Sequence, residues 1–383
     1  MIDTRKFVSL LTKNKINFYC GVPDSCLKFF LNYIAKARKK HIIAPNEGSA
    51  VSIGIGYYLK TKKLPLIYLQ NSGLGNATDP LTSLCSKESY SIPMLLLVGW
   101  RGSPRIKDEP QHSLMGRITP KFLKLLEIKF SILRKDSDLK KIPLLIKYSQ
   151  KVKKPVACII EPNTLSKIFL SKKDNAFLDS LIFKREKKKF LGNLIFRPDA
   201  IKCILKSLKR KTNIISTTGF TSRELHQIKK QENIKMCKDF LMIGGMGHTA
   251  TTTLGTMLFD KKKDAICLDG DGSFLMHMGG VASAVAYSNN NLKYVVFDNN
   301  SHESVGPTNQ PTISGKINFK KMSEGFGFKK FFSLENNKNY KKKLTKYIKT
   351  KGSVFILIKI KAGSLSSLER PEDMKKIKNN FMY

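Results

Sequence analysis

Short, continuous apolar runs recur along the chain, and each is ended by glycine, asparagine or proline. They cover residues 64–69, 94–98 and 156–160, then 213–216, 240–243, 265–268, 294–297 and 354–358. Continuous runs are typical of strands buried on both faces, whereas alternating runs indicate strands with one face in water. Because helical stretches separate the runs, the pattern predicts parallel α/β sheets with helices on both faces.

Two helical stretches have readable starting points. Asp3 is a suitable N-cap, and Phe7, Leu10 and Leu11 follow with the spacing of one helix face. A second helix, of small residues, is expected over 51–59, and the segment 45–50, which contains Glu47, opens it. A glutamate in this position interacts favourably with the helix dipole, so Glu47 by itself indicates no function.

A change of texture divides the chain. Residues 166–194 are Lys-rich and irregular, which is typical of an interdomain linker with some local helix. The chain of 383 residues is long enough for a domain on either side. We therefore predict two doubly wound parallel-sheet domains, 1–165 and 195–383, joined by this linker.

The charge is far from balanced, with 69 Lys and Arg against 29 Asp and Glu and a formal net charge of +40. A basic nucleic-acid-binding protein is one interpretation. The lysines are spread over the whole chain, however, without interleaved aromatic residues or a zinc-finger spacing, so we favour a solvated basic surface and predict no nucleic-acid partner. Such a surface still attracts small anionic substrates and cofactors.

The cysteines and the apolar segments restrict the class further. Seven cysteines without a CxxC pair argue against a disulfide framework and a structural zinc site. The longest apolar stretch, 92–100, is far shorter than the ~20 residues of a membrane span. We expect a cytoplasmic protein that does not enter a membrane.

An isolated carboxylate follows one of the predicted strands. Asp271 stands between Gly270 and Gly272, just after the run 265–268. Ligands of open parallel sheets bind at the carboxyl ends of strands, and the amides of Gly272 and Ser273 at the start of a helix favour a phosphate. A carboxylate beside a phosphate indicates Mg²⁺. In isolation, the tripeptide is at least as well explained by an ordinary turn.

A second set of oxygen ligands follows the run 294–297. Asp298 and Asn299 precede Asn300, whose amide oxygen is available, and the backbone carbonyl of His302 lies two residues further on. Both polar segments stand at strand ends, and carboxyl ends of neighbouring parallel strands share one edge of a sheet. The pair therefore favours a magnesium site over a simple turn.

A GDG segment followed by NN at this spacing resembles the diphosphate-binding motif of thiamine diphosphate enzymes. The resemblance implies that Asp271, Asn300 and the carbonyl of His302 bind Mg²⁺, and that Met246 holds the cofactor bent while the carbonyl of Gly244 accepts from its amino group. It gives Glu47, in the other domain, the contact with the pyrimidine ring. It implies further cofactor contacts from Thr218, Gly219, Thr221, Ser222, Gly270, Gly272, Ser273 and Asn300.

The absence of a middle domain resembles one branch of this family, the phosphonopyruvate decarboxylases and the related sulfopyruvate decarboxylases. The matching stretches are GVPDS (21–25), NEGSA (46–50), LQNSGLGNATDPLTSL (69–84), GWRGSP (99–104), KDEPQHSLMG (107–116), TTGFTSREL (217–225), GGMGH (244–248) and NNSHESVG (299–306). The resemblance implies decarboxylation of a short anionic 2-oxo acid by a homodimer or larger oligomer, with the cofactor between subunits.

Candidate substrate residues lie in the matching stretches. Ser25 and His112 are expected to act in catalysis, His112 by moving a proton or orienting the substrate. Donors and cations for a doubly anionic substrate are expected from Arg101, Lys107, Gln111 and Ser304. A solvated surface is the alternative for Arg101 and Lys107. Two departures from the phosphonopyruvate pattern, a longer segment over 304–312 and Arg105 in place of glycine, leave the substrate open between phosphonopyruvate, sulfopyruvate and similar acids.

Overall fold

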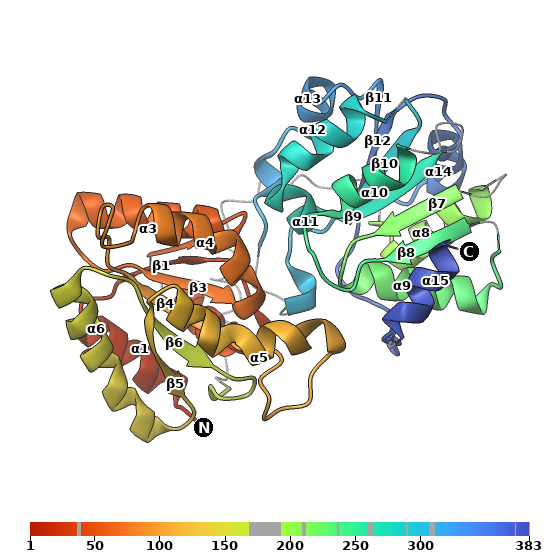
Figure 1. Ribbon diagram of the computed structural model, residues 1–383. Helices are drawn as coiled ribbons and strands as arrows, with labels where there is room; N and C mark the ends of the chain where they lie inside the picture. The colour runs from red at the N-terminus through yellow and green to blue at the C-terminus, as the bar shows by residue number, and fades with distance from the viewer. Residues whose placement is uncertain are drawn as a thin grey trace. The chain divides into compact units, whose positions relative to one another are not determined.

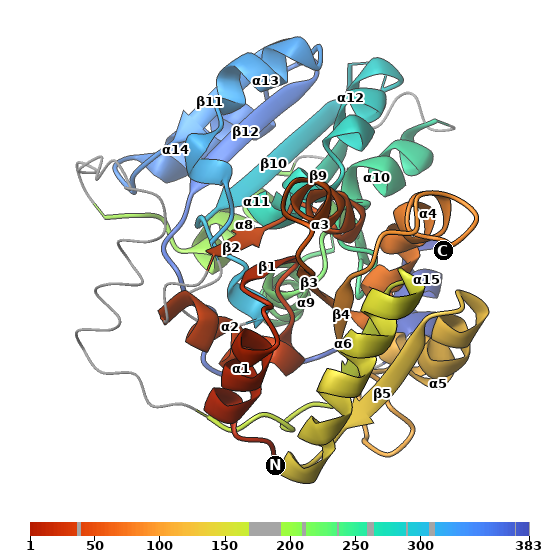
Figure 2. The same ribbon diagram turned by 90° about the vertical axis from the view of Figure 1, so that its left-hand side faces the viewer.

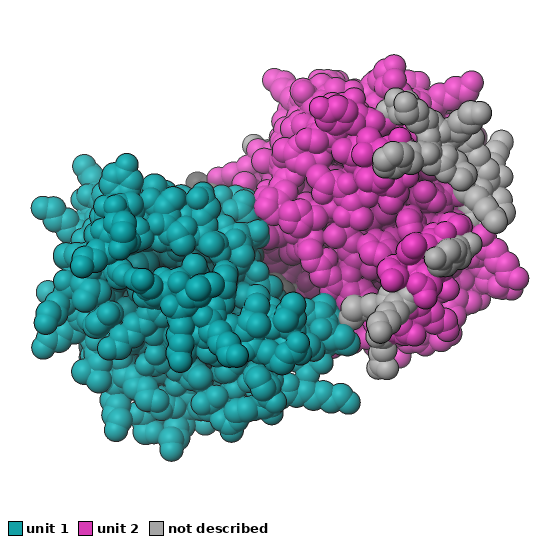
Figure 3. All heavy atoms as spheres, viewed as in Figure 1, with its two compact units in different colours: residues 1–185, 305–311 teal, residues 186–304, 312–383 magenta. Residues whose placement is uncertain are grey.

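The computed structural model describes residues 1–36, 40–167, 193–208, 212–235, 237–258, 264–288, 290–305, 311–371 and 373–382. The chain divides into two compact units (Figure 3), residues 1–185 with 305–311 and residues 186–304 with 312–383. The division at 185 falls within the predicted linker, 166–194. That linker lies outside the described residues except for its two ends.

Unit 1 is built on a six-stranded parallel sheet in the order β2-β1-β3-β4-β6-β5 (Figure 1). Its strands are β1 (Phe18–Gly21), β2 (Lys40–Ile43), β3 (Leu66–Gln70), β4 (Leu95–Gly99), β5 (Lys129–Leu133) and β6 (Val156–Ile160). Its helices are α1 (Thr4–Lys13), η1 (Ser25–Leu27), α2 (Lys28–Lys36), α3 (Glu47–Thr61), η2 (Asn71–Gly73), α4 (Leu74–Ser83), α5 (Pro110–Leu125), η3 (Asp136–Lys140) and α6 (Lys141–Val152).

Helices cover both faces of this sheet, because its strands are apolar on both sides. Leu66, Leu95 and Leu97 pack with α1, α2 and α6 on one face. The alternate residues, such as Ile67 and Leu96, pack with α3, α4 and α5 on the other. Each face encloses a core of aliphatic and aromatic side chains, and burial of this area is the main force that stabilises the unit.

Unit 2 repeats the plan with a six-stranded parallel sheet in the order β11-β12-β10-β9-β7-β8 (Figure 1; Figure 2 labels the part from β11 to β9). Its strands are β7 (Thr212–Ser216), β8 (Cys237–Leu241), β9 (Ala265–Gly270), β10 (Leu292–Asp298), β11 (Lys330–Leu334) and β12 (Val354–Lys359). Its helices are α8 (Arg197–Ser207), α9 (Phe220–Gln231), α10 (Thr249–Met257), α11 (Asp271–Met276), α12 (Met278–Ala286), η4 (Glu303–Val305), η5 (Ser314–Lys316), α13 (Phe319–Gly325), α14 (Tyr340–Ile348) and α15 (Met374–Met382).

The predicted fold class, two doubly wound parallel α/β sheets, is confirmed. The predicted opening helix is also confirmed, since Asp3 accepts hydrogen bonds from the amides of Arg5 and Lys6 at the start of α1. One predicted strand is displaced: the run 240–243 belongs to a strand that spans Cys237–Leu241. The apolar pattern did not reveal β1, β2, β5 and β11, and three of these four are edge strands.

Two predictions about composition can be compared with the structure. All seven cysteines are free thiols, and six of them are buried, as expected for small apolar side chains in a core. No helix in the described parts of the chain is long and apolar enough to cross a bilayer.

Candidate active site

In unit 2, the predicted cofactor residues follow three neighbouring strands. The loop 217–219 follows β7, Asp271 follows β9, and Asn300 follows β10, and these strands are adjacent in the sheet. All three segments therefore emerge at the same edge, the carboxyl end of the sheet, where parallel α/β folds bind ligands.

The predicted metal ligands converge on one hydroxyl group. The Ser314 Oγ lies 2.9 Å from Asp271 Oδ2 and 2.6 Å from Asn300 Oδ1. It also lies 2.8 Å from Asp298 Oδ1. Thr312 donates its own hydroxyl proton to Asp271 Oδ2 at 2.5 Å. The fold thus brings Asp271 and Asn300 to one point, together with Ser314 and Thr312, which the sequence did not indicate. Their binding of a metal ion stays a prediction.

This cluster has more acceptors than protons. A serine hydroxyl donates only one hydrogen bond, yet the oxygens of Asp271, Asp298 and Asn300 all surround Ser314. Asp298 has its own cation, because it forms an ion pair with Lys359. Burial, with the neighbouring charge of Asp298, raises the pKa of Asp271 to about 8. The arrangement therefore favours a bound cation beside Asp271.

Gly272 lies at a point of close approach. A methyl group at this position would stand 2.8 Å from His302 Cε1 and 3.4 Å from the Met246 methyl carbon. Gly270 has open space in front of it, with nothing within 4 Å of the same position. Met246, Gly272 and His302, which the sequence places far apart, thus lie together. Burial lowers the pKa of His302 to about 4, so this imidazole is neutral at pH 7.

Ser273 connects two of the predicted cofactor loops. Its Oγ accepts from Thr217 Oγ1 at 2.9 Å and from the Gly247 amide at 3.1 Å. Gly219 adopts a φ of +94°, which glycine reaches without strain, and a methyl group at this position would stand 3.6 Å from the Ser304 side chain. The Ser222 hydroxyl bonds the Thr217 carbonyl at 2.6 Å, so it fixes the loop.

The remaining predicted cofactor positions are placed as follows. Thr221 is buried in the first turn of α9, Thr218 is half-buried in the loop before this helix, and Gly244 is exposed in the loop after β8. Their predicted contacts with a cofactor stay predictions.

Glu47 is the first residue of α3 in unit 1, and it is buried. The preceding Asn46 caps the helix, since its Oδ1 accepts from the Ser49 amide at 2.8 Å. The Glu47 Oε2 accepts a hydrogen bond from Asn76 Nδ2 at 2.8 Å. Gly73 lies directly against the Glu47 carboxylate and leaves no room for a larger residue. A carboxylate this enclosed is positioned tightly.

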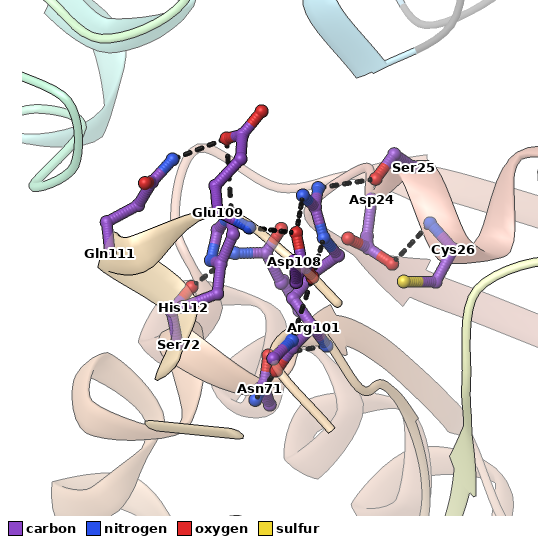
Figure 4. A network of polar contacts seen from close by, with 12 residues as sticks. Asp24, Ser25, Cys26, Asn71, Ser72, Arg101, Asp108, Glu109, Gln111 and His112 are labelled. Atoms are coloured by element: carbon purple, nitrogen blue, oxygen red, sulfur yellow. Dashed lines mark hydrogen bonds and ion pairs between the residues drawn. The ribbon is translucent and has the colours of Figure 1, made fainter. Parts of the chain in front are cut away.

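Arg101 is held by a carboxylate of its own loop (Figure 4). Its Nε donates to Asp108 Oδ2 at 2.7 Å and its Nη2 to Asp108 Oδ1 at 2.5 Å. This bidentate pair raises the pKa of Arg101 and, despite partial burial, lowers that of Asp108. Asp108 therefore offsets the positive charge of Arg101, which was predicted to bind an anionic substrate.

Ser25 faces the same guanidinium, and its Oγ accepts from Arg101 Nη1 at 3.2 Å. Beside it lies Asp24, whose buried Oδ1 has no hydrogen-bond partner among the described residues. Burial raises the pKa of Asp24 to about 6. Sequence reasoning missed this acid, although it stands inside the GVPDS stretch.

A cavity of about 300 Å³ opens on this cluster. Ser25, Arg101 and the exposed Lys107 are among its lining residues, together with Phe29 and Asp108. Three of the predicted catalytic and substrate residues thus share one cavity of unit 1.

Gln111 and His112 begin α5 close to this cluster (Figure 4). Both face Glu109: the Gln111 Nε2 donates to Glu109 Oε2 at 2.5 Å, and the His112 Nε2 lies 3.9 Å from the same oxygen. The Gln111 Oε1 is buried without a hydrogen-bond partner among the described residues. The Glu109 carboxylate thus lies beside both side chains at the start of α5.

Two family models match the chain. "Thiamine pyrophosphate enzyme, N-terminal TPP binding domain" covers residues 4–121, and "Thiamine pyrophosphate enzyme, C-terminal TPP binding domain" covers 217–358. A phosphonopyruvate decarboxylase from Streptomyces viridochromogenes is 30% identical over 97% of this chain and 92% of its own. The chain belongs to the thiamine pyrophosphate-dependent decarboxylases. It has the two cofactor-binding domains of that family with no middle domain between them.

Other relatives of this thiamine pyrophosphate-dependent decarboxylase are named as decarboxylases of sulfopyruvate. A sulfopyruvate decarboxylase from Methanosarcina acetivorans is 26% identical over 79% of this chain and 76% of its own. The sulfopyruvate decarboxylase subunit beta of Methanocaldococcus jannaschii is 37% identical over 34% of this chain and 66% of its own. The comparisons support a decarboxylase of 2-oxo acids that is similar to phosphonopyruvate decarboxylase over nearly its whole length.

Proposed function

We propose that this enzyme decarboxylates 3-phosphonopyruvate to phosphonoacetaldehyde and carbon dioxide, as a step of phosphonate biosynthesis. The observation that carries the proposal is the meeting of Asp271 and Asn300 at Ser314, where a diphosphate and its metal ion would be held. Similarity to a phosphonopyruvate decarboxylase over nearly the whole of both chains favours this substrate.

Mg²⁺ is the metal ion that best fits the residues around Ser314. Asp271 and Asn300 offer oxygen ligands, and the buried carboxylate lacks a cation of its own within the described residues. The described residues of the chain hold no cluster of three His, Cys, Asp or Glu side chains such as zinc or iron would need. Magnesium commonly uses one or two protein oxygens and completes its shell with phosphate and water. The His302 carbonyl would supply the third ligand from the protein.

When bound, thiamine diphosphate supplies the electron sink that decarboxylation requires. The chain's own part is to position and to exchange protons. Glu47 would face the pyrimidine ring and share a proton with it, held in place by Asn76 and Gly73. Met246, which reaches over Gly272, would keep the two rings of the cofactor close together.

The substrate would be recognised in the cavity of unit 1. Lys107 is exposed there and Arg101 presents its guanidinium beside Ser25, so a phosphonate can compete with Asp108 for these donors. Gln111, His112 and Ser304 remain the candidates for the carboxylate and for proton transfer. The nearby acids Asp24, Asp108 and Glu109 would compete with a substrate for these cations. Only a strongly anionic substrate would therefore bind.

We further infer a homodimer or larger oligomer as the working form. The resemblance to thiamine diphosphate enzymes places the pyrimidine contact, Glu47, in one subunit and the metal ligand Asp271 in its partner. The two residues lie in different units of this chain. In the arrangement that the resemblance implies, each cofactor would be held by two subunits.

Purified enzyme supplied with thiamine diphosphate and Mg²⁺ tests the substrate directly. Release of carbon dioxide is compared for phosphonopyruvate, sulfopyruvate and pyruvate at equal concentrations. We expect the highest kcat/KM with phosphonopyruvate, and loss of turnover when EDTA removes the metal ion. A higher kcat/KM with sulfopyruvate would assign the second substrate, which the similarity to the Methanosarcina acetivorans protein makes the alternative.

A further inference from the structure

Arg197, the first residue of α8, is buried in unit 2 at a junction that no predicted site residue occupies. We propose that Arg197 is a positioning residue, which holds together the loops after β7 and β10. The inference rests on the proposed function, because that function assigns these two loops to the diphosphate and to its metal ion.

The first loop is held through Glu224. The Arg197 Nε donates to Glu224 Oε2 at 2.7 Å, and Nη2 donates to Glu224 Oε1 at 3.1 Å. Glu224 is fully buried in the second turn of α9, the helix that begins directly after the loop 217–219. The guanidinium also lies 5.5 Å from the ring of Phe220, the first residue of that helix. Arg197 thus fixes the beginning of α9.

The second loop is held through Glu303. The remaining nitrogen of the fork, Nη1, donates to Glu303 Oε2 at 3.3 Å. The same oxygen accepts from Asn299 Nδ2 at 3.0 Å, and the other carboxylate oxygen accepts from the Gly363 amide. Asn299 and Glu303 enclose the segment that carries Asn300 and His302, the predicted metal ligands. The position of these ligands therefore depends on where Glu303 is held.

Only an arginine meets the demands of this junction. The guanidinium offers donors in a fixed planar fork, which here reach Glu224, Glu303 and the Gly363 carbonyl at once. Burial opposes its charged form, but the bonds to Glu224 raise its pKa overall. A lysine would keep the positive charge and yet reach only part of this set, since its ammonium is a compact point charge. Arg197→Lys therefore keeps the positive charge but removes the hydrogen bonds that link the two loops, so it tests the two contributions separately.

Isothermal titration of the metal-loaded protein with thiamine diphosphate measures the effect without turnover. We expect Arg197→Lys to raise the dissociation constant about tenfold, the loss of roughly one charge-assisted hydrogen bond. Glu303→Gln should weaken binding in the same direction. In the wild type, the amides of Asn300 and Ser301 donate to Asp298 Oδ1 and Asn299 Oδ1. In the cofactor-free variants, hydrogen exchange at these two amides should be faster than in the cofactor-free wild type. At saturating cofactor, kcat should change less than twofold.

Lys293→Met is the matched control. Lys293 is also buried in unit 2, at the opposite end of β10, where its Nζ donates to the Gly352 carbonyl at 2.7 Å. This variant loses a buried charged group without touching either loop, so its cofactor affinity should stay within twofold of the wild type.

The outcomes separate the two claims. If Arg197→Lys binds as well as the wild type, or if Lys293→Met weakens binding as much, the positioning role is refuted. If the wild-type protein itself binds no thiamine diphosphate, the proposed function fails. Should Arg197→Lys not fold, Glu303→Gln carries the same test, because it alters the loop's anchor and leaves the Arg197 pair with Glu224 intact.

Discussion

The sequence was sufficient to predict single candidate site residues, but not the residues that contact and position them. Asp271 and Asn300 were predicted because each directly follows an apolar run and the glycines beside Asp271 are conspicuous. Ser314 and Thr312 were not, since they reach Asp271 from 43 and 41 residues away and their hydroxyls look like any others in the sequence. Arg197 was missed for the same reason. A residue that acts by holding another has no local signal.

Asp24 provides a pH prediction at this scale. Its pKa is raised from the ordinary value near 3.8 to about 6 because the carboxyl is buried. The folded state thus binds the proton more tightly than the unfolded state, and stability falls as the pH rises from about 4 to about 6. Replacing the charge by Asp24→Asn should therefore stabilise the protein at pH 7.5, by about 1–2 kcal/mol, and much less at pH 4.5.

Thermal unfolding at the two pH values measures this difference. Asp108→Asn is the control of opposite sign, because the pair with Arg101 lowers the pKa of Asp108, so its loss should destabilise the protein at pH 7.5. An Asp24→Asn variant that gained the same stability at both pH values would show that Asp24 does not titrate as described.

At the scale of elements, burial on both faces is what most of the recognised strands share, although the short buried strand β1 was missed. The central strands β3, β4, β6, β9, β10 and β12 have both faces covered, so they appear as continuous apolar runs. The edge strands are different: β5 and β11 expose one end and are only half-buried along most of their length, and their sequences carry Lys, Phe and Ser side by side. Their strand conformation comes from pairing with a neighbour, which a local pattern does not record.

The short helix η2 is the element on which two predicted sites meet. At one end, Asn71 exchanges hydrogen bonds with the backbone of Arg101, at 2.8 and 3.1 Å. At the other end, Gly73 packs on the Glu47 carboxylate. Small displacements of η2 would therefore disturb the candidate catalytic acid and the substrate loop together.

Gly73→Ala tests this arrangement with one methyl group. The added carbon would overlap the Glu47 carboxylate, whereas the helical backbone accepts alanine without strain. We expect kcat to fall at least about tenfold, because misplaced catalytic groups are costly, with a small change in melting temperature. Gly75→Ala is the control two residues away, where a methyl meets nothing within 4 Å. It should keep full activity, and equal losses in both variants would contradict the role of Gly73.

For the whole molecule, the net charge of +40 is consistent with the proposed reaction of an anionic substrate. The proposed substrate and the cofactor would both be multiply anionic, and a general positive field raises the local concentration of anions at low ionic strength. The charge says nothing about which surfaces meet in an oligomer. In the proposed oligomer, Glu47 and Asp271, which lie in different units of one chain, would reach the same cofactor from two subunits.

Mixing two inactive variants tests that association. Glu47→Gln should bind the cofactor and lose most decarboxylation, and Asp271→Asn should lose metal-dependent binding of the diphosphate. In a symmetric dimer that joins one chain of each kind, one site carries both substitutions and the other carries none. Random assortment of equal amounts makes half of the dimers hybrid, so about a quarter of wild-type activity should return in the mixture and about half in the isolated hybrid dimer.

The hybrid experiment distinguishes a site shared between subunits from a site within one chain. The variants are co-expressed with different tags, and the doubly tagged oligomer is isolated and assayed for carbon dioxide release. Each variant alone, handled in the same way, is the control and should stay inactive. If the doubly tagged oligomer also stays inactive, Glu47 and Asp271 act within the same subunit. Restored activity would require that Glu47 of one chain reaches the cofactor bound beside Asp271 of another.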